Sequence, residues 1–242
     1  MAAYQGERYI ALQLRSILEQ LAPGDEVVVV DDCSTDNTYG EVSAIDDPRI
    51  VLIRNTTNRG VLRTFEAALS RARGQIILLS DQDDIWLPGK VDATLSAFGL
   101  DPQLMLLTSD AILIDEHGNE LERSYYAKRG KFRADLWSNL LICKFLGCTM
   151  ALRMELLTRA WPFPRDTRIH HDIWLGCVNA LIGGKTRYIS DSLVAYRRHA
   201  ENVTGRVRFS IYKRVQMRLQ LILALVAFSW RAWRVKYARV SR

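Results

Sequence analysis

Residues 76–84 read IILLSDQDD, four apolar residues followed at once by a serine and then by three aspartates within four positions. Residues 27–32, VVVVDD, repeat this order on a smaller scale. Continuous apolar runs of this length predict strands that are buried on both faces. In an open α/β sheet, ligands bind outside the carboxyl ends of the strands. We therefore expect the two groups of acids to meet at one edge of one sheet.

Helical patterns alternate with these strands. Apolar residues recur at helical spacing over residues 10–21 and 61–72, and short apolar runs at 50–53 and 104–107 indicate further strands. This alternation predicts βαβ units and a mainly parallel sheet. After Asp115 the pattern loosens, and the elements expected there are a helix near 136–142, a strand near 148–152, a helix near 173–182, and a strand pair or one bent strand over 188–196.

The acids after residue 79 suit a metal site. Like charges packed at one edge repel unless a cation or hydrogen-bond donors compensate them. Mg²⁺ or Mn²⁺ bridging to phosphate oxygens would do so, because these hard cations take oxygen ligands. Asp81 and Asp83 stand at i and i+2, which point the same way in an extended segment. For Asp31 and Asp32 the alternative is turn and helix-cap chemistry ahead of Ser34.

Composition excludes several classes of protein. With 242 residues, 48% of them hydrophobic and 25% charged, the chain is neither disordered nor collagen-like nor a multispan membrane protein. No secretory signal pattern follows Met1. Four cysteines without a CxxC pair argue against a disulfide scaffold or zinc ribbon and fit a reducing, cytoplasmic compartment.

Taken in order, the motifs resemble the family 2 glycosyltransferases, which are inverting enzymes of the GT-A fold. The resemblance covers residues 1 to about 205 and rests on AYQGERYI (3–10), SILEQ (16–20), VVDDCSTD (29–36), NRG (58–60), LLSDQDDIWLP (78–88), HDIW (171–174) and YRRH (196–199). The form SDQDDIW looks most like bacterial rhamnosyltransferases of surface-polysaccharide pathways. The resemblance implies transfer of a sugar, rhamnose being one candidate, from a UDP- or dTDP-linked donor to a saccharide or lipid-linked acceptor.

Several residues on the donor side take roles from this resemblance. Tyr4 would lie against the nucleotide base, Asp32 would accept a hydrogen bond from the base imide, and Gln82 is a further donor-binding residue. Arg63 is a candidate contact to the base or the diphosphate, and a solvated helix face is its alternative.

The resemblance also implies a metal and a general base. Asp81 would meet the ribose and join Asp83 at the Mg²⁺ or Mn²⁺ ion that holds the diphosphate. Asp172 would take the proton from the acceptor hydroxyl as that oxygen attacks the anomeric carbon. The apolar spacing after it places Asp172 in the first turn of a helix, where a helix N-cap is the alternative role. No further His or Cys has the spacing for a zinc site with His170 and His171.

The expected acceptor side is a looser set of residues. Trp86 can stack on an acceptor sugar or belong to the core, and Cys148 can border the acceptor or mark a tight strand entry. His199 can approach the diphosphate or metal, or be an ordinary surface histidine. The full set expected at the acceptor is Asp84, Trp86, Cys148, His171 and His199.

The chain departs from the family at its start. The family opens with a buried strand of about five apolar residues before the AYQG segment, whereas this sequence begins inside the end of that strand. A shortened central strand would leave both neighbours without hydrogen-bond partners and leave an apolar slot between them. We therefore expect a truncated first strand, with the natural start upstream or a shortened chain.

A basic tail follows the predicted catalytic domain. Of the 33 Lys and Arg, ten lie after Glu201, where no acid follows, so the first 201 residues carry 23 basic and 27 acidic groups. Tyr212, Val215, Leu219 and Ile222 begin an apolar face that recurs every three or four residues. We expect a GT-A domain over 1–205, divided at 115/116 into a nucleotide-sugar half and an acceptor half.

An amphipathic helix is expected over 206–242. It would lie on anionic lipid at the inner face of the membrane, and packing on protein is the alternative. Its apolar run is too short to span a bilayer. No nucleic-acid recognition motif accompanies the charge, so nucleic acid is not an expected partner.

Two other functions compete with this interpretation. A sugar-nucleotide nucleotidyltransferase shares the α/β plan, but it carries a Gly-rich phosphate loop that residues 1–10 lack. A receiver-like or inactive nucleotide-binding module also places acids after a strand, but it would leave Asp81 to Asp84 and Asp172 unused. Only a glycosyltransferase is expected to hydrolyse a sugar donor slowly.

Overall fold

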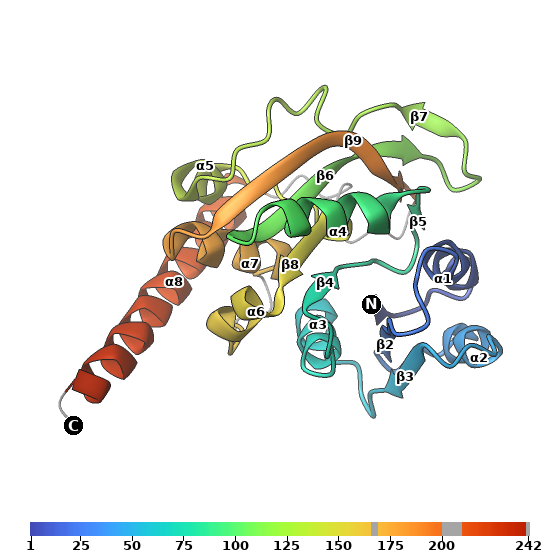
Figure 1. The fold of residues 1–242 in the computed structure, drawn as a ribbon, viewed down its shortest axis with the longest axis horizontal. Helices are drawn as coiled ribbons and strands as arrows, with labels where there is room; N and C mark the ends of the chain where they lie inside the picture. Colours follow the sequence, from blue (N-terminus) through green and yellow to red (C-terminus); the bar gives the residue numbers. More distant parts are fainter. Residues whose placement is uncertain (166–168, 200–209, 241–242) are drawn as a thin grey trace.

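The computed structural model describes residues 1–165, 169–199 and 210–240. Two sheets and the helices around them form one α/β body, from which the last helix projects (Figure 1). The predicted α/β class is confirmed. The predicted division at residue 115/116 stays a prediction, because β6 (Leu104–Ile114) ends there in the middle of the larger sheet.

The first sheet is small and parallel. Its strands are β1 (Ala2–Ala3), β2 (Val27–Asp31) and β3 (Ile50–Arg54), in that spatial order, and β2 is buried along its whole length. The helices α1 (Ile10–Leu18), α2 (Thr38–Ser43) and α3 (Val61–Leu69) connect and cover these strands. The expected helices at 10–21 and 61–72 are thus present, each a few residues shorter than the apolar pattern.

The second sheet is mixed rather than mainly parallel. The bounds of its strands are β4 (Ile76–Leu78), β5 (Ile85–Trp86), β6 as above, β7 (Glu120–Glu122) on the edge of β6, β8 (Met150–Arg153) and β9 (Lys185–Arg197). Its order is β4-β8-β6-β9-β5; β6 pairs in parallel with β9, while β8 is antiparallel to both β4 and β6. The expectation that both groups of acids follow strands of one sheet is therefore wrong, because β2 belongs to the first sheet and β4 to the second. The bent-strand alternative for 188–196 is therefore correct, because β9 is one strand whose register shifts along β6.

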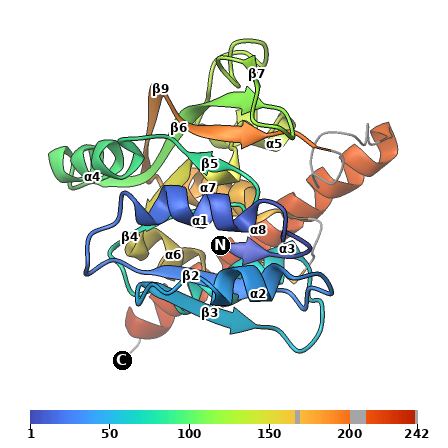
Figure 2. The same cartoon turned by 90° about the vertical axis from the view of Figure 1, so that its right-hand side faces the viewer.

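Helices cover this second sheet. They are α4 (Lys90–Leu100), α5 (Leu136–Leu141), a 3-10 turn at Gly147–Thr149, α6 (Met154–Ala160), α7 (His171–Leu181) and α8 (Ile211–Val240). Figure 2 shows α1 between the two sheets and α2 against the small one. Helix α6 was not predicted, since seven residues are too few to establish a helical period.

An apolar cavity lies beside the short strand β1. It has a volume of about 460 Å³ and is lined by side chains from β2, β4, α1 and α3. The amino group of Met1 lies inside it and donates to the carbonyl of Val28 at 2.7 Å, and burial lowers the pKa of this amine to about 5. The cavity corresponds to the slot that the sequence predicted between the neighbours of a shortened first strand.

Helix α8 presents two apolar faces. One face is buried in the hydrophobic core beside the second sheet and consists of Leu221, Leu225 and Phe228. Phe228 packs edge-on against Trp174 of α7, with ring centroids 5.8 Å apart. The face predicted to bind lipid is a different one. Its described members remain exposed, namely Tyr212, Val215, Leu219, Ile222, Val226 and Trp230. None of the described helices is apolar over enough residues to cross a membrane.

Candidate active site

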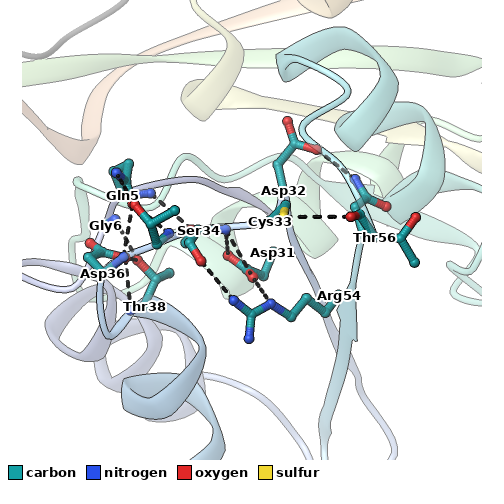
Figure 3. Close-up of polar contacts among 12 residues, drawn as sticks. Gln5, Gly6, Asp31, Asp32, Cys33, Ser34, Asp36, Thr38, Arg54 and Thr56 are labelled. Atoms are coloured by element: carbon teal, nitrogen blue, oxygen red, sulfur yellow. Dashed lines mark hydrogen bonds and ion pairs between the residues drawn. The ribbon is translucent and has the colours of Figure 1, made fainter.

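Hydrogen bonds and one ion pair with neighbouring polar side chains hold the loop after β2 in place (Figure 3). The carboxylate of Asp31 is buried, accepts from the amide of Ser34 at 3.3 Å and pairs with Nε of Arg54 at 3.1 Å. The side-chain amide of Gln5 bridges to the same loop, with its Oε1 accepting from the amides of Thr35 and Asp36 at 3.0 and 3.1 Å. The side chain of Asp31, the last residue of β2, therefore stabilises the turn that follows, which is the alternative that the sequence left open for it.

Asp32 holds the next loop in place. Its Oδ1 accepts from Nδ2 of Asn55 at 2.7 Å and from the amide of Arg59 at 2.9 Å, and its Oδ2 accepts from the amide of Gly60 at 2.8 Å. These contacts fix residues 55–60, which lead into α3. A carboxylate oxygen has two acceptor positions, so Oδ2 retains one for a further donor.

Gln82 joins the ends of the two sheets. Its side-chain amide accepts from the amide of Tyr4 at 2.8 Å and donates to the carbonyl of Tyr4 at 2.9 Å. The Tyr4 side chain is 46% exposed beside this link. The short β1 and the acidic loop after β4 are thereby held together, as a shared nucleotide site requires.

Three carboxylates from two distant segments meet beyond β4. Asp81 and Asp83 follow that strand directly, and Asp172 lies in the first turn of α7. Burial, together with the nearby carboxylates of Asp83 and Asp172, raises the pKa of Asp81 to about 7. Buried carboxylates that lie this close to one another are typical of a site that binds a cation.

His199 completes this group from the far end of the chain. Its Nε2 lies 2.7 Å from Oδ2 of Asp83, and its ring packs at 5.2 Å on Tyr9. Arg197, two residues earlier, donates from Nε to the carbonyl of Asp83 at 2.8 Å. Of the two roles considered for His199, contact with the expected metal ligand is the one the geometry fits.

Asp84 points away from Asp83, into the protein. It is 1% exposed, and its Oδ1 accepts from the amide of Arg197 at 2.9 Å. A ligand atom from each of Asp81, Asp84 and Cys148 lies within 4.8 Å of the others. Burial raises the pKa values of the Asp84 carboxyl and the Cys148 thiol well above their usual range. Protonated groups are poor metal ligands, so Asp84 and Cys148 are packing neighbours of Asp81 rather than expected metal ligands.

Lys90 lies against the same inner cluster. Its ammonium group is buried, donates to the carbonyl of Cys148 at 3.1 Å and has a pKa lowered by burial to about 8. Sequence reasoning missed Lys90 and Arg197. A lysine in an amphipathic helix gives no sign of burial, and the contact of Arg197 with Asp83 spans 114 residues.

The base candidate is not a helix cap. His170 occupies the N-cap position of α7, and Oδ1 of Asp172 accepts from the amide of Ile173 at 2.7 Å. A carboxylate in the first turn of a helix interacts favourably with the positive end of the helix dipole. The ring of His171 stacks on Phe65 at 3.6 Å, and burial lowers the pKa of His171 to about 4.

The remaining predicted residues face inward. The guanidinium of Arg63 pairs with Glu66 at 2.5 Å and donates to the carbonyl of Pro164 at 2.8 Å. The side chain of Trp86 is 5% exposed and belongs to the core around α1, the alternative that the sequence left open. Cys148 is fully buried, and His171 is 6% exposed.

The outer residues fit a hard divalent cation. Asp81 and Asp83 offer carboxylate oxygens, and His199 offers an imidazole nitrogen beside them. Carboxylate ligands suit Mg²⁺ and Mn²⁺, and a bound cation would stabilise the ionised form of Asp81, whose pKa is raised by burial and by the carboxylates of Asp83 and Asp172. The donor set therefore fits the predicted ion.

Comparisons with known proteins bear on this site. The family model described as glycosyl transferase family 2 matches residues 1–161. An uncharacterized glycosyltransferase of Nostoc is 28% identical over 216 residues (82% of this chain, 63% of that protein). A UDP-Glc:alpha-D-GlcNAc-diphosphoundecaprenol beta-1,3-glucosyltransferase of Escherichia coli, WfgD, is 29% identical over 178 residues (72% and 66%). A putative teichuronic acid biosynthesis glycosyltransferase of Bacillus subtilis, TuaG, is 27% identical over 200 residues (81% and 76%).

Solved structures share the fold. Residues 1–349 of S. aureus TarS in complex with UDP-GlcNAc match with a TM-score of 0.69 and 20% identity, over 92% of this chain and 65% of that one. The mannosyltransferase PcManGT from Pyrobaculum calidifontis, in complex with GDP-Man and Mn²⁺, matches with a TM-score of 0.58 and 24% identity, over 96% and 62%. The chain spans less than two thirds of the Nostoc and Escherichia coli relatives.

Proposed function

The chain belongs to the family 2 glycosyltransferases and has the GT-A fold, and from this premise we propose that it transfers a sugar from a nucleoside diphosphate donor to a saccharide or lipid-linked acceptor in cell-surface polysaccharide synthesis. The observation that carries the proposal is the meeting of Asp81, Asp83 and Asp172 at the ends of β4 and α7. A nucleotidyltransferase or a receiver-like module has no use for a carboxylate at the start of α7.

The donor nucleotide lies across the ends of β1, β2 and β4. Tyr4 offers an exposed ring to the base, and the remaining acceptor position on Asp32 suits the imide N–H of uracil or thymine. Gln82 keeps Tyr4 in place, and Arg63 reaches the donor only if it leaves Glu66. The names of the relatives favour a UDP-linked donor, whereas the SDQDDIW segment favours dTDP-rhamnose.

The diphosphate is bound at the outer carboxylates. Asp81 and Asp83 would hold the Mg²⁺ or Mn²⁺ ion, with His199 beside Asp83. When bound, the ion would supply positive charge that stabilises the leaving diphosphate. The contact of Arg197 with the carbonyl of Asp83 fixes the loop that carries both ligands.

Asp172 is the general base of the reaction. The acceptor oxygen forms a bond to the anomeric carbon as the bond from that carbon to the diphosphate oxygen breaks, and the hydroxyl proton passes to the Asp172 carboxylate. One in-line displacement inverts the configuration at the anomeric carbon. Four of the predicted acceptor residues shape the acceptor side indirectly, because their burial leaves little surface for direct contact with the acceptor. They are Asp84, Trp86, Cys148 and His171.

A transfer assay tests the proposal. Purified protein with Mn²⁺ is given labelled UDP-glucose, UDP-GlcNAc or dTDP-rhamnose, with GlcNAc-diphospholipid as acceptor. We expect donor hydrolysis, and transfer from one donor, with both abolished by Asp83→Asn. Asp46→Asn, on an exposed loop, is the matched control. Release of inorganic diphosphate from a sugar phosphate and a nucleoside triphosphate would instead identify a nucleotidyltransferase.

Membrane binding through residues 206–242 is part of the proposal and puts the reaction on the cytoplasmic face of the membrane. The exposed face of α8 supports it, as do the exposed Trp137 and Leu141 on the neighbouring helix α5. An amphipathic helix of this kind binds anionic lipid through apolar burial and basic side chains.

Vesicle flotation tests the membrane contact. Changing Val215, Leu219 and Val226 to Gln removes the outer apolar face but spares the packed one. We expect the wild type to float with vesicles containing phosphatidylglycerol and the variant to remain in the bottom fraction of the gradient. Leu100→Gln, which changes a still more exposed leucine on α4, should float like the wild type. Equal flotation of the triple variant would refute the contact.

A further inference from the structure

A second cavity lies between α3, the turn at residues 162–165, the start of α7 and the middle of α8. Its volume is about 770 Å³. The carboxylates of the proposed donor site are not among its lining residues, and Arg63 is the one lining residue to which the family resemblance gave a ligand. Its walls differ in character, because one side is basic and the other apolar.

The basic side consists of arginines. Arg59, Arg165 and Arg231 line the cavity with exposed side chains, and no acidic side chain among the described residues pairs with them. The fourth arginine, Arg63, is neutralised by Glu66, whose other oxygen accepts from the amide of Phe163 at 3.3 Å. The cavity thus keeps a surplus of three positive charges, which suits a ligand with two or more negative charges.

The apolar side comes from α8 and α7. Leu223, Ala224 and Ala227 form one wall, and the buried Trp174 lies at the base. Oε1 of Gln220, on the same helix, is buried and has no hydrogen-bond partner among the described residues. A buried acceptor without a donor is costly, so a ligand that carries a hydroxyl or amide N–H would gain from this contact.

The cavity adjoins the turn that carries the proposed base. Ile169 and Trp174, both lining residues, stand on either side of Asp172 in the chain. At the same junction His171 stacks on Phe65 of α3 at 3.6 Å. Along α8 the cavity adjoins the exposed apolar face described above, because Leu223 follows Leu219 by four residues and precedes Val226 by three. A ligand here can be close both to the acceptor hydroxyl and to a lipid surface.

We propose that this cavity holds the diphosphate and first isoprene units of an isoprenoid diphosphate-linked acceptor. Arg59, Arg165 and Arg231 bind the diphosphate, and Leu223, Ala224 and Ala227 contact the hydrocarbon chain. The inference rests on the proposed function, since it names the acceptor of the same reaction. A phosphate alone would not use the apolar wall, and a plain lipid would not use the arginines.

Calorimetry with short probes tests the assignment. The full chain is titrated with geranyl diphosphate, geraniol and inorganic diphosphate at fixed ionic strength. We expect geranyl diphosphate to bind most tightly. The double variant Arg165→Gln/Arg231→Gln should bind it at least tenfold more weakly, because one charge-assisted hydrogen bond is worth about a factor of ten. Arg71→Gln/Arg187→Gln removes the same charge from exposed positions outside the cavity and should bind like the wild type.

Binding of UDP with Mn²⁺, measured on the same proteins, separates this inference from the proposed function. We expect both double variants to keep it. Equal binding of geranyl diphosphate by the Arg165/Arg231 variant and the wild type would overturn the inference, as would equal binding of geraniol and geranyl diphosphate. Loss of UDP binding in that variant would assign the cavity to the donor and overturn it too. A wild type that binds geranyl diphosphate but never UDP would refute the proposed function while keeping the cavity assignment.

Discussion

His171 should make the protein unstable to acid, and its replacement should remove most of that sensitivity. The imidazole is stacked on Phe65, and neither ring nitrogen has a hydrogen-bond partner among the described residues. Burial lowers the pKa of His171 from 6.5 to about 4. Below pH 6.5, His171 therefore binds a proton in the unfolded chain, whereas in the folded chain it stays neutral until the pH is near 4. The stability is complete above pH 6.5 and is lost as the pH falls toward 4.

The magnitude follows from the two pKa values. Between pH 7.5 and pH 4.5 this one group lowers the free energy of unfolding by about 2.5 kcal/mol. His171→Gln removes the titration at some constant cost in packing, and His171→Phe removes it at a different cost, because Gly147 approaches the ring closely. Constant costs cancel when each protein is compared with itself at the two pH values.

Urea unfolding followed by circular dichroism at pH 7.5 and 4.5 measures the effect. Relative to the wild type, both variants should lose about 2.5 kcal/mol less on acidification. His117→Gln changes a histidine in an exposed turn and should behave like the wild type. If all four proteins lost the same free energy between the two pH values, the buried neutral state of His171 would be wrong.

Three further predictions concern the site. Asp172→Asn should lower the transfer rate by about 10²–10⁴-fold while UDP binding stays at the wild-type level, as calorimetry and a transfer assay on one preparation would show; parallel loss of both would contradict its role as a base. Gln82→Ala removes two hydrogen bonds to Tyr4 and should weaken UDP binding about tenfold, with a change of only ~1 kcal/mol in unfolding free energy; unchanged UDP affinity would place Tyr4 outside the donor site. Because the pKa of Asp81 is raised to about 7, protons compete with the cation below that pH, so Mn²⁺-dependent UDP binding should weaken roughly tenfold from pH 8 to pH 6; a flat profile would remove Asp81 from the ligands.

The strand ends and their acids could be predicted because they depend on local patterns. A buried run followed by carboxylates indicates where a strand ends and that the acids lie beyond its carboxyl end. It does not indicate which sheet the strand joins, and β2 and β4 lie in different sheets. Asp81 lies near Asp83 but also within 4.8 Å of the inner residues Asp84 and Cys148, and Asp84 turns inward to the amide of Arg197.

Contacts between distant segments could not be predicted. The approach of His199 to Asp83 and the burial of Lys90 depend on how β9 and α4 pack, which no spacing in the sequence encodes. The lining of the second cavity likewise comes from three segments that are more than 40 residues apart in the chain.

Helix α8 illustrates the same limit on a single element. The sequence predicted one apolar face and left open whether it binds lipid or protein. Residues 221–228 are apolar on nearly every side, so periodicity alone did not select the face that packs. In the structure, Leu221, Leu225 and Phe228 pack into the core beside α7. The face that the sequence predicted to bind lipid stays exposed.

The most direct test of the carboxylate site is the calorimetric binding of UDP with and without Mn²⁺, on the wild type and on Asp83→Asn. The account predicts tight binding only with Mn²⁺, loss of that binding in Asp83→Asn, and wild-type behaviour in the control Asp46→Asn. Metal-independent binding, or equal Mn²⁺-dependent binding by Asp83→Asn and the wild type, would contradict the claim that the acids beyond β4 hold a metal-bound nucleoside diphosphate.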